Sequence, residues 1–442
     1  MNWIRIPQPT LDRPPGGGTS IMASLGKLFD RLLFQLRRFM QFMRMFDEVT
    51  HPGPTGMAQN SGATPARYQE IVKAIELPDR LMPLTRFERA APGEASLIGA
   101  MARLAAETVV ENYCLMRTPG SFACAMRDQH AKSHGCVGAE LIVRDDLPAE
   151  FATSLFHAGA RYPAIVRFSN GNGRPQSDRR IDGRGMSIKL HHVEGTTVLR
   201  NLAPDKTRRG EHDFLLGSFP VFFCKNVVDY SQLMYAVTAP RGTWRQWLGF
   251  GVRWLEFIVR YPRQFITFIR IGLKLIDDPL TATYHSMSPY LFGRDKVVRY
   301  VVGPAAPARK AGWWRRILAW LGSENFLRDA LLRDLDPAQR HGADEYVFDF
   351  SVRIRDSAKA ADVEDASLWW KAPLDRVVRL GQIVVPKQNL APDRQYDCER
   401  TMFSPWNCVE EHRPLGSLNR MRLAVYLASL QVRQKLNLVD RE

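Results

Sequence analysis

The most chemically suggestive feature of the sequence is a tyrosine between two arginines near residue 430. Arg422, Tyr426 and Arg433 lie in the stretch RMRLAVYLASLQVRQKL, which is typical of a helix. Offsets of four and seven residues place the three side chains on one helical face, as an Arg–Tyr–Arg comb. Ionising a tyrosine of pKa about 10 at neutral pH costs roughly 4 kcal/mol. A ferric ion and a guanidinium one turn away could together supply this free energy, so the spacing is typical of a tyrosinate ligand of haem iron.

A surface helix that half-buries a tyrosine could show the same spacing, so the comb needs support from elsewhere in the chain. Five further motifs precede it. In order, they are RDQHAK at residues 127–132, RFS at 167–169, DGRG at 182–185, PVFF at 220–223 and FSP at 403–405. With these motifs in this order, the sequence resembles the catalase superfamily from about Phe122 to Arg433.

The resemblance implies catalytic roles for residues of the first two motifs. His130 resembles the acid/base that accepts the proton of a bound hydroperoxide and returns it to the leaving oxygen. Ser169 resembles the serine that orients this imidazole. Gln129 stands where hydrogen-peroxide catalases usually carry valine and the related allene oxide synthases carry a polar residue. It could restrain the His130 ring or contact an organic peroxide.

The resemblance also implies a cofactor, haem b with ferric iron. Tyr426 would be the axial iron ligand, and Arg422 would keep it ionised. Arg127, Arg167 and Arg433 resemble the arginines that hold the two haem propionates, because planar guanidinium groups suit carboxylates. The aromatic residues that would either wall the haem pocket or belong to an ordinary core are Phe222, Phe223 and Tyr230.

One position departs from the pattern of the hydrogen-peroxide catalases. Those enzymes carry an asparagine, which hydrogen-bonds peroxide, three residues before the proline of the PVFF motif. Here that residue is Gly217, and Ser218 next to it could substitute only in part. Together with Gln129, this change argues against fast dismutation of hydrogen peroxide. The resemblance is therefore closer to the small catalase-like peroxidase and allene oxide synthase branch.

The first motif and the residues after it could alternatively indicate a zinc site. His130, His134 and Cys136 cluster in the sequence, and His-x-x-x-His is a helical zinc spacing. The glutamate of a zinc protease is replaced by Ala131, and residues 137–143 look like a strand, so zinc is disfavoured. The six cysteines show no paired CxxC spacing, which favours reduced thiols in a cytosolic chain.

Positive charge and apolar residues alternate in three helical stretches, near residues 28–46, 244–276 and 313–320. The net charge is +15, and the mixture favours binding to an anionic membrane surface. The same stripes could instead pack on the protein itself or across the interface of a homo-oligomer. Nucleic-acid binding is disfavoured because no binding motif accompanies the charge. Without a secretory signal or a long apolar span, we expect a cytoplasmic protein, either free or peripheral on the inner face of the membrane.

The elements that must position these residues form an α+β fold. We expect a first region over residues 1–60, with a disordered start, a basic amphipathic helix near 24–47 and a linker. Residues 61–442 form the catalase-like haem domain, with helical insertions at about 230–280 and 311–335. Short apolar or alternating runs, clearest at residues 346–354, predict a closed antiparallel β-barrel. The resemblance implies eight strands and a C-terminal proximal helix that carries the comb.

The sequence therefore predicts a haem-dependent enzyme that acts on peroxides. Organic or lipid hydroperoxides are the expected substrates, by peroxidation or by rearrangement, and the sequence does not decide between these two reactions. One alternative is a low-activity hydrogen-peroxide catalase. An alternative of another class is a peripheral membrane haem-binding protein without efficient catalysis.

Overall fold

The structure, a computed structural model, describes residues 66–77, 82–116, 124–180, 182–195, 197–201, 210–237, 244–306, 322–338, 344–370 and 375–439. All of them belong to one of the two units into which the chain divides, Gln59–Glu442. The amphipathic helix expected near residues 24–47 and the tryptophan-rich stretch at 313–320 therefore lie outside the described residues.

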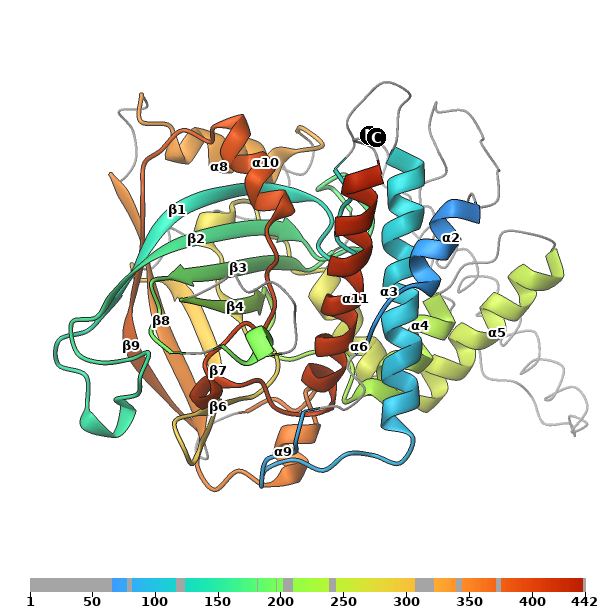
Figure 1. Ribbon diagram of the computed structural model, residues 1–442, viewed down its shortest axis with the longest axis horizontal. Helices are drawn as coiled ribbons and strands as arrows, with labels where there is room; N and C mark the ends of the chain where they lie inside the picture. The colour runs from blue at the N-terminus through green and yellow to red at the C-terminus, as the bar shows by residue number, and fades with distance from the viewer. Residues whose placement is uncertain are drawn as a thin grey trace, which may run out of the picture. The chain divides into compact units, whose positions relative to one another are not determined.

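The described strands form a closed antiparallel barrel (Figure 1). They are β1 (Ser133–Val143), β2 (Arg161–Asn170), β3 (Arg184–His191), β4 (Glu211–Gly217), β5 (Tyr284–His285), β6 (Tyr290–Phe292), β7 (Lys296–Pro304), β8 (Glu345–Arg355) and β9 (Asp375–Pro386). Their order is β5-β4-β3-β2-β1-β9-β8-β7-β6, and β5 also pairs with β7. This pairing closes a ring of eight strands and leaves β6 as an addition beside β7. The predicted barrel of about eight strands is confirmed.

The alternation of apolar and polar residues in β8 explains why this segment is a strand with one face in the barrel core. Phe348, Phe350, Val352 and Ile354 point into the barrel and are at most 1% exposed. They meet aromatic residues from the other strands. For example, the ring centroids of Phe214 and Phe350 lie 5.0 Å apart. The barrel interior is thus filled with side chains, and the polar residues of the motifs must act on its outer face or in its loops.

Helices cover one side of the barrel and fill the connections between strands. Those described are α2 (Ala66–Lys73), α3 (Glu94–Met116), α4 (Val227–Val237), α5 (Trp244–Arg260), α6 (Pro262–Gly272), α8 (Phe326–Leu335), α9 (Ala360–Glu364), α10 (Pro392–Arg400) and α11 (Ser417–Val439). Short 3-10 helices lie at Ala149–Phe151, Val198–Asn201, Pro279–Thr281 and Glu410–His412. None of the described helices is long and apolar enough to cross a membrane.

The long helix α11 stands between the barrel and α3 (Figure 1). Small residues make this close packing possible, because Ala102 and Ala105 of α3 share a buried cluster with Ala424 and Ala428 of α11. On the other side, Tyr426 packs beside a cluster that includes Leu215 of β4. The helix therefore holds its comb between the α3 layer and the outer face of the barrel.

A buried ion cluster fixes the start of α11. The Arg420 guanidinium contacts the carboxylates of Glu88 at 2.8 Å, Glu94 at 2.6 Å and Glu364 at 2.9 Å. Burial opposes the charge, but hydrogen bonds to Glu94 and Glu364 raise the pKa of Arg420. Glu88 and Glu94 lie 332 and 326 residues before Arg420 in the sequence, so this cluster ties α11 to a distant part of the chain and sets the position of Arg422 two residues further on.

Candidate functional site

His130 lies in the loop before β1 with a strained backbone. Its φ is 57°, a left-handed conformation that costs a non-glycine residue on the order of 1–3 kcal/mol. Two hydrogen bonds hold it there. The His130 N–H donates to the carbonyl oxygen of Gly171 at 3.2 Å. Arg167 Nη2 donates to the His130 carbonyl oxygen at 2.9 Å. Such strain persists where the surroundings impose it, and it often marks a functional residue.

The His130 ring is oriented by two residues of the barrel. Its Nδ1 atom lies 3.0 Å from Ser169 Oγ. A Cβ atom on Gly185 would lie only 2.5 Å from the ring, so glycine alone leaves room for the imidazole there. Burial, together with the charges of Arg167 and Arg422, lowers the pKa of His130 to about 3. The ring is therefore neutral at pH 7 and can accept a proton on one nitrogen.

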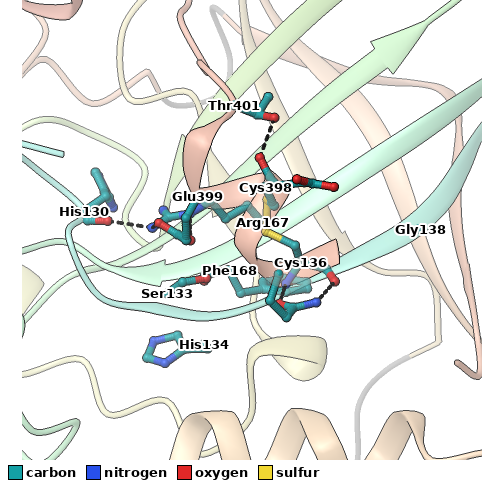
Figure 2. Close-up of a disulfide and its surroundings, with 12 residues drawn as sticks. His130, Ser133, His134, Cys136, Gly138, Arg167, Phe168, Cys398, Glu399 and Thr401 are labelled. Atoms are coloured by element: carbon teal, nitrogen blue, oxygen red, sulfur yellow. Dashed lines mark hydrogen bonds and ion pairs between the residues drawn. A yellow bond between two sulfur atoms is a disulfide. The ribbon is translucent and has the colours of Figure 1, made fainter. Parts of the chain in front are cut away.

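Three arginines surround Glu399, two at its carboxylate and one at its backbone, and Figure 2 shows Arg167 beside it. Arg127 contacts it at 2.8 Å and Arg167 at 3.0 Å. Arg433 donates to the Glu399 backbone carbonyl. Burial alone would raise the pKa of Glu399, but Arg167 and Arg127 lower it to about 2. With one carboxylate among three guanidinium groups, the cluster keeps a surplus of positive charge that suits further carboxylates.

A disulfide between Cys136 of β1 and Cys398 of α10 lies next to this cluster (Figure 2). Gln395 of the same helix also binds β1, because its side-chain amide exchanges hydrogen bonds of 2.7 and 2.8 Å with the Cys136 backbone. Glu399 is thereby anchored beside the barrel.

The expectation that all six cysteines are reduced is wrong for Cys136 and Cys398. The two are 262 residues apart, so only the fold reveals that their Cα atoms lie within 6.4 Å.

The comb lies on α11 as its spacing predicts. Arg422 Nη2 donates to the Tyr426 hydroxyl at 3.5 Å, and its guanidinium carbon lies 5.7 Å from the centre of the ring. Both side chains are half-buried. Burial disfavours the charge of Arg422, but the Tyr426 and Tyr290 hydroxyls raise its pKa. Arg433, the third member, belongs to the arginine cluster around Glu399.

The three aromatic residues proposed as pocket walls lie together. Phe222 and Phe223 stack with ring centroids 4.2 Å apart, and Tyr230 lies 6.1 Å from Phe222. Phe268 of the inserted helix α6 meets Phe223 edge-on at 5.5 Å. Burial raises the pKa of Tyr230, and the nearby groups Asp128, Cys224 and Tyr426 raise it further. Phe222, Tyr230 and Tyr426 all pack against one buried cluster, so the aromatic group borders the comb.

Among the described residues, Gln129 forms no hydrogen bond to the His130 ring. Its side chain is exposed, and its Nε2 lies near Gly173. Its neighbour Asp128 turns inward instead and hydrogen-bonds Ser429 of α11. Burial raises the pKa of Asp128. This contact ties the His130 loop to the helix that carries the comb.

The fold does not bring together the three residues of the alternative zinc site, His130, His134 and Cys136. His134 and Cys136 lie on β1, as the strand-like pattern of residues 137–143 suggested, and Cys136 is in the disulfide. His134 is buried, 3.8 Å from Asp178, and burial lowers its pKa to about 3. In the described part of the chain, no three His, Cys, Asp or Glu side chains are placed to hold a metal ion.

Comparison with known proteins shows what the chain resembles. No family model matches the chain. A catalase-related peroxidase of Mycolicibacterium paratuberculosis is 24% identical over 333 residues, which cover 72% of this chain and 92% of that protein. Catalase isozyme A of Oryza sativa is 28% identical over 207 residues, 44% of this chain and 37% of that one. Catalase A from Saccharomyces cerevisiae has the same fold, with a TM-score of 0.53 and 15% identity over 80% of this chain and 68% of that chain. A bacterial catalase gives a TM-score of 0.50 at 16% identity, over 82% of this chain and 68% of that chain.

The chain is similar in sequence to a catalase-related peroxidase and to catalases, and it has the catalase fold. It matches nearly the full length of the catalase-related peroxidase but little more than a third of the rice catalase.

Sequence reasoning missed several residues of this candidate site. Glu399 lies four residues before the FSP motif, and nothing in its neighbourhood marks it as the partner of three arginines. Asp128 lies inside the first motif, where its burial could have been suspected from the position alone. Phe268 belongs to an amphipathic helix, and only the packing of α6 shows that it joins the aromatic group.

Proposed function

We propose that the protein is a haem-dependent enzyme that acts on peroxides, with Tyr426 as the axial ligand of ferric haem b. Its relatives named catalase-related peroxidase and catalase support chemistry on peroxide. The observation that carries the proposal is the meeting of a strained, neutral His130 with the comb of α11. Arg167 holds both the His130 carbonyl oxygen and the carboxylate of Glu399, and Arg433 of α11 donates to the Glu399 backbone, which supports a shared site.

The residues present fit a haem. The arginine cluster of Arg127, Arg167 and Arg433 has a surplus of positive charge, which suits two propionates. Gly185 leaves the space in which the His130 ring lies. The aromatic group and Tyr426 are only half-buried, so they keep surface for an apolar, planar ligand. When bound, the haem would supply a redox-active iron for cleavage of the peroxide O–O bond.

The residues of the chain would move the proton. Neutral His130 accepts the proton of the hydroperoxide and returns it to the oxygen that leaves, which contributes typically 10²–10⁴-fold to such a reaction. Ser169 holds the ring through Nδ1, and Arg167 holds the backbone carbonyl of the same residue. Arg422 Nη2 donates to the Tyr426 hydroxyl and would place its positive charge beside the oxygen that binds iron.

Organic or lipid hydroperoxides are the proposed substrates, by peroxidation or by rearrangement. The position at which hydrogen-peroxide catalases hold peroxide with an asparagine is Gly217 here. Apolar side chains of α6, such as Phe268, border the aromatic group and suit an organic substituent. The competing proposal, a slow hydrogen-peroxide catalase, has the same His130 and the same comb.

An anionic membrane surface is the proposed place of action, because α5 has two apolar faces. Phe250, Trp254 and Phe257 are buried on one face. The opposite face exposes a stripe that nothing among the described residues covers: Leu248 (56%), Val252 (57%), Leu255 (44%) and Val259 (73%). On α6, the exposed residue Ile266 lies between the exposed cations Arg263 and Arg270. Apolar residues beside arginines suit lipid headgroups better than a second copy of this basic chain.

The decisive experiment compares two activities of the purified, haem-loaded protein. Oxygen evolution from hydrogen peroxide reports dismutation. Consumption of a fatty-acid hydroperoxide reports action on lipid peroxides, and loss of its conjugated-diene signal marks rearrangement, because reduction to the alcohol keeps the diene. Faster turnover of the lipid substrate supports the proposal, and faster oxygen evolution supports the slow catalase. Haem without either activity would support a membrane haem-binding protein instead.

A further inference from the structure

Two glycines occupy neighbouring positions on the barrel face that carries Ser169. Ser169 of β2 pairs with Gly185 of β3, which pairs in turn with Gly217 of β4. Directly opposed residues of antiparallel strands point to the same face. The preceding or following residues along each strand point the other way and belong to the barrel core: Phe168, Met186 and Leu216. The row formed by Ser169, Gly185 and Gly217 therefore faces outward.

Each glycine makes room for a side chain from another segment. A Cβ atom on Gly185 would lie 2.5 Å from the His130 ring. A Cβ atom on Gly217 would lie 2.3 Å from the Met287 Sδ atom. Opposed Cβ positions are about 5 Å apart, so the Met287 sulfur and the His130 ring lie on one face within about 10 Å of each other. Any side chain at position 217 would compete with Met287 for this space.

A strained turn presents Met287 at this point. Its φ is 61°, and the Ser288 N–H donates to the Ser286 carbonyl oxygen at 2.7 Å, which together form a γ-turn of the rare, strained kind. Side chains lock the turn. Ser286 Oγ donates to the Ser288 carbonyl oxygen at 2.8 Å, and Ser288 Oγ donates to Asn419 Oδ1 of α11 at 3.1 Å. The helix that carries the comb thus also fixes Met287.

We propose that Met287 determines which peroxide the site prefers, and this proposal rests on the proposed function. A thioether has no hydrogen-bond donor and is only a weak acceptor, but it is polarisable and packs well against apolar groups. It occupies the space that a hydrogen-bonding side chain at position 217 would take. The organic group of an alkyl or lipid hydroperoxide would pack against Met287. Hydrogen peroxide would find no donor there.

The test replaces the thioether without changing its size. Met287→Gln introduces an amide of similar length, and Met287→Leu is the matched control that keeps an apolar side chain. The probes are cumene hydroperoxide and hydrogen peroxide. An apolar side-chain contact contributes about 1.5 kcal/mol or more, which is about tenfold. We expect the ratio of the two kcat/KM values, organic over inorganic, to fall about tenfold in Met287→Gln and to stay within about threefold in Met287→Leu.

A second readout does not depend on turnover. Cumyl alcohol carries the same organic group without the peroxide bond, and calorimetric titration should give about tenfold weaker binding to Met287→Gln than to Met287→Leu. Met287→Gly, which suits the positive φ, provides a second variant if Met287→Gln does not fold. An unchanged ratio together with unchanged alcohol binding in the folded variant would overturn the proposal. Weakened alcohol binding in a protein that turns over neither peroxide would reject the proposed function and keep Met287 as a binding residue.

Discussion

Arg167 and Glu399 form a two-point ion pair, and the same guanidinium holds the backbone of His130. The two contacts to the carboxylate measure 3.0 and 3.2 Å, and the contact to the His130 carbonyl oxygen measures 2.9 Å. One arginine thus joins the anion-binding cluster to the proposed acid/base. A change at Glu399 should therefore be felt both in the stability of the fold and at His130.

Glu399→Gln should lower the stability of the protein at neutral pH. Removing the charge of Glu399 costs up to about 3–5 kcal/mol, because Arg167 is only 1% exposed and its guanidinium keeps its desolvation cost. The control is Glu140→Gln, which breaks an exposed two-point pair with Arg161 and should cost at most about 1 kcal/mol. Urea unfolding of both variants measures the difference. Equal losses would mean that the Glu399 cluster adds nothing beyond a surface pair.

The same carboxylate predicts how stability depends on pH. The folded pKa of Glu399, about 2, lies below the unfolded value of about 4.3. The unfolded chain therefore binds the proton first, and the stabilisation is full above about pH 4.3 and lost as the pH falls toward 2. Unfolding curves at pH 5 and pH 3 should show a steeper loss for the natural protein than for Glu399→Gln. Parallel curves would contradict the low pKa.

His130→Ala should retain haem and lose peroxide turnover by about 10²–10⁴-fold, because proton transfer is its proposed role. His157→Ala removes an exposed histidine and serves as the control. The folded pKa of His130, about 3, also implies that the natural enzyme keeps its base neutral well below pH 6.5. Rates measured from pH 5 to 8 should therefore show no acid limb near 6.5. Full activity of His130→Ala would exclude the acid/base role.

Tyr426→Phe should lose haem or shift its electronic spectrum strongly, because phenylalanine offers iron no oxygen ligand. Tyr396→Phe changes a tyrosine that is 48% exposed on α10 and should leave the spectrum as it is. The comparison uses the Soret band of equal amounts of both proteins, together with their haem content. An unchanged band in Tyr426→Phe would reject axial ligation by this residue.

The sequence predicts those parts of the fold and site that depend on local spacing or on short motifs. The alternation of β8 and the comb of α11 are local patterns, and both occur in the structure as expected. The pairing of Cys136 with Cys398, the role of Glu399 and the approach of Met287 to Gly217 depend on contacts between distant segments. No local periodicity encodes such contacts. The exposed position of Gln129 likewise follows from the turn of its loop and not from its neighbours in sequence.

The disulfide should be detectable by counting thiols. Alkylation in denaturant without a reductant should modify four cysteines, namely Cys114, Cys124, Cys224 and Cys408. After reduction all six should react. Closing so long a loop contributes about 2–4 kcal/mol, so Cys136→Ser should lower stability by about this amount. Six reactive thiols without a reductant would show that the pair is reduced in the purified protein.

The exposed stripe of α5 gives the last prediction. Leu248→Glu together with Val259→Glu places two carboxylates on the face that we propose for lipid, where burial and repulsion from anionic headgroups both oppose binding. Leu438→Glu changes a leucine that is 61% exposed on α11 and is the matched control. Sedimentation with vesicles that contain phosphatidylserine should fall for the double variant alone, and added salt should weaken binding of the natural protein. If binding is undiminished while the oligomeric state changes, the stripe is an interface between copies of the chain, because a membrane contact could not tolerate two buried carboxylates.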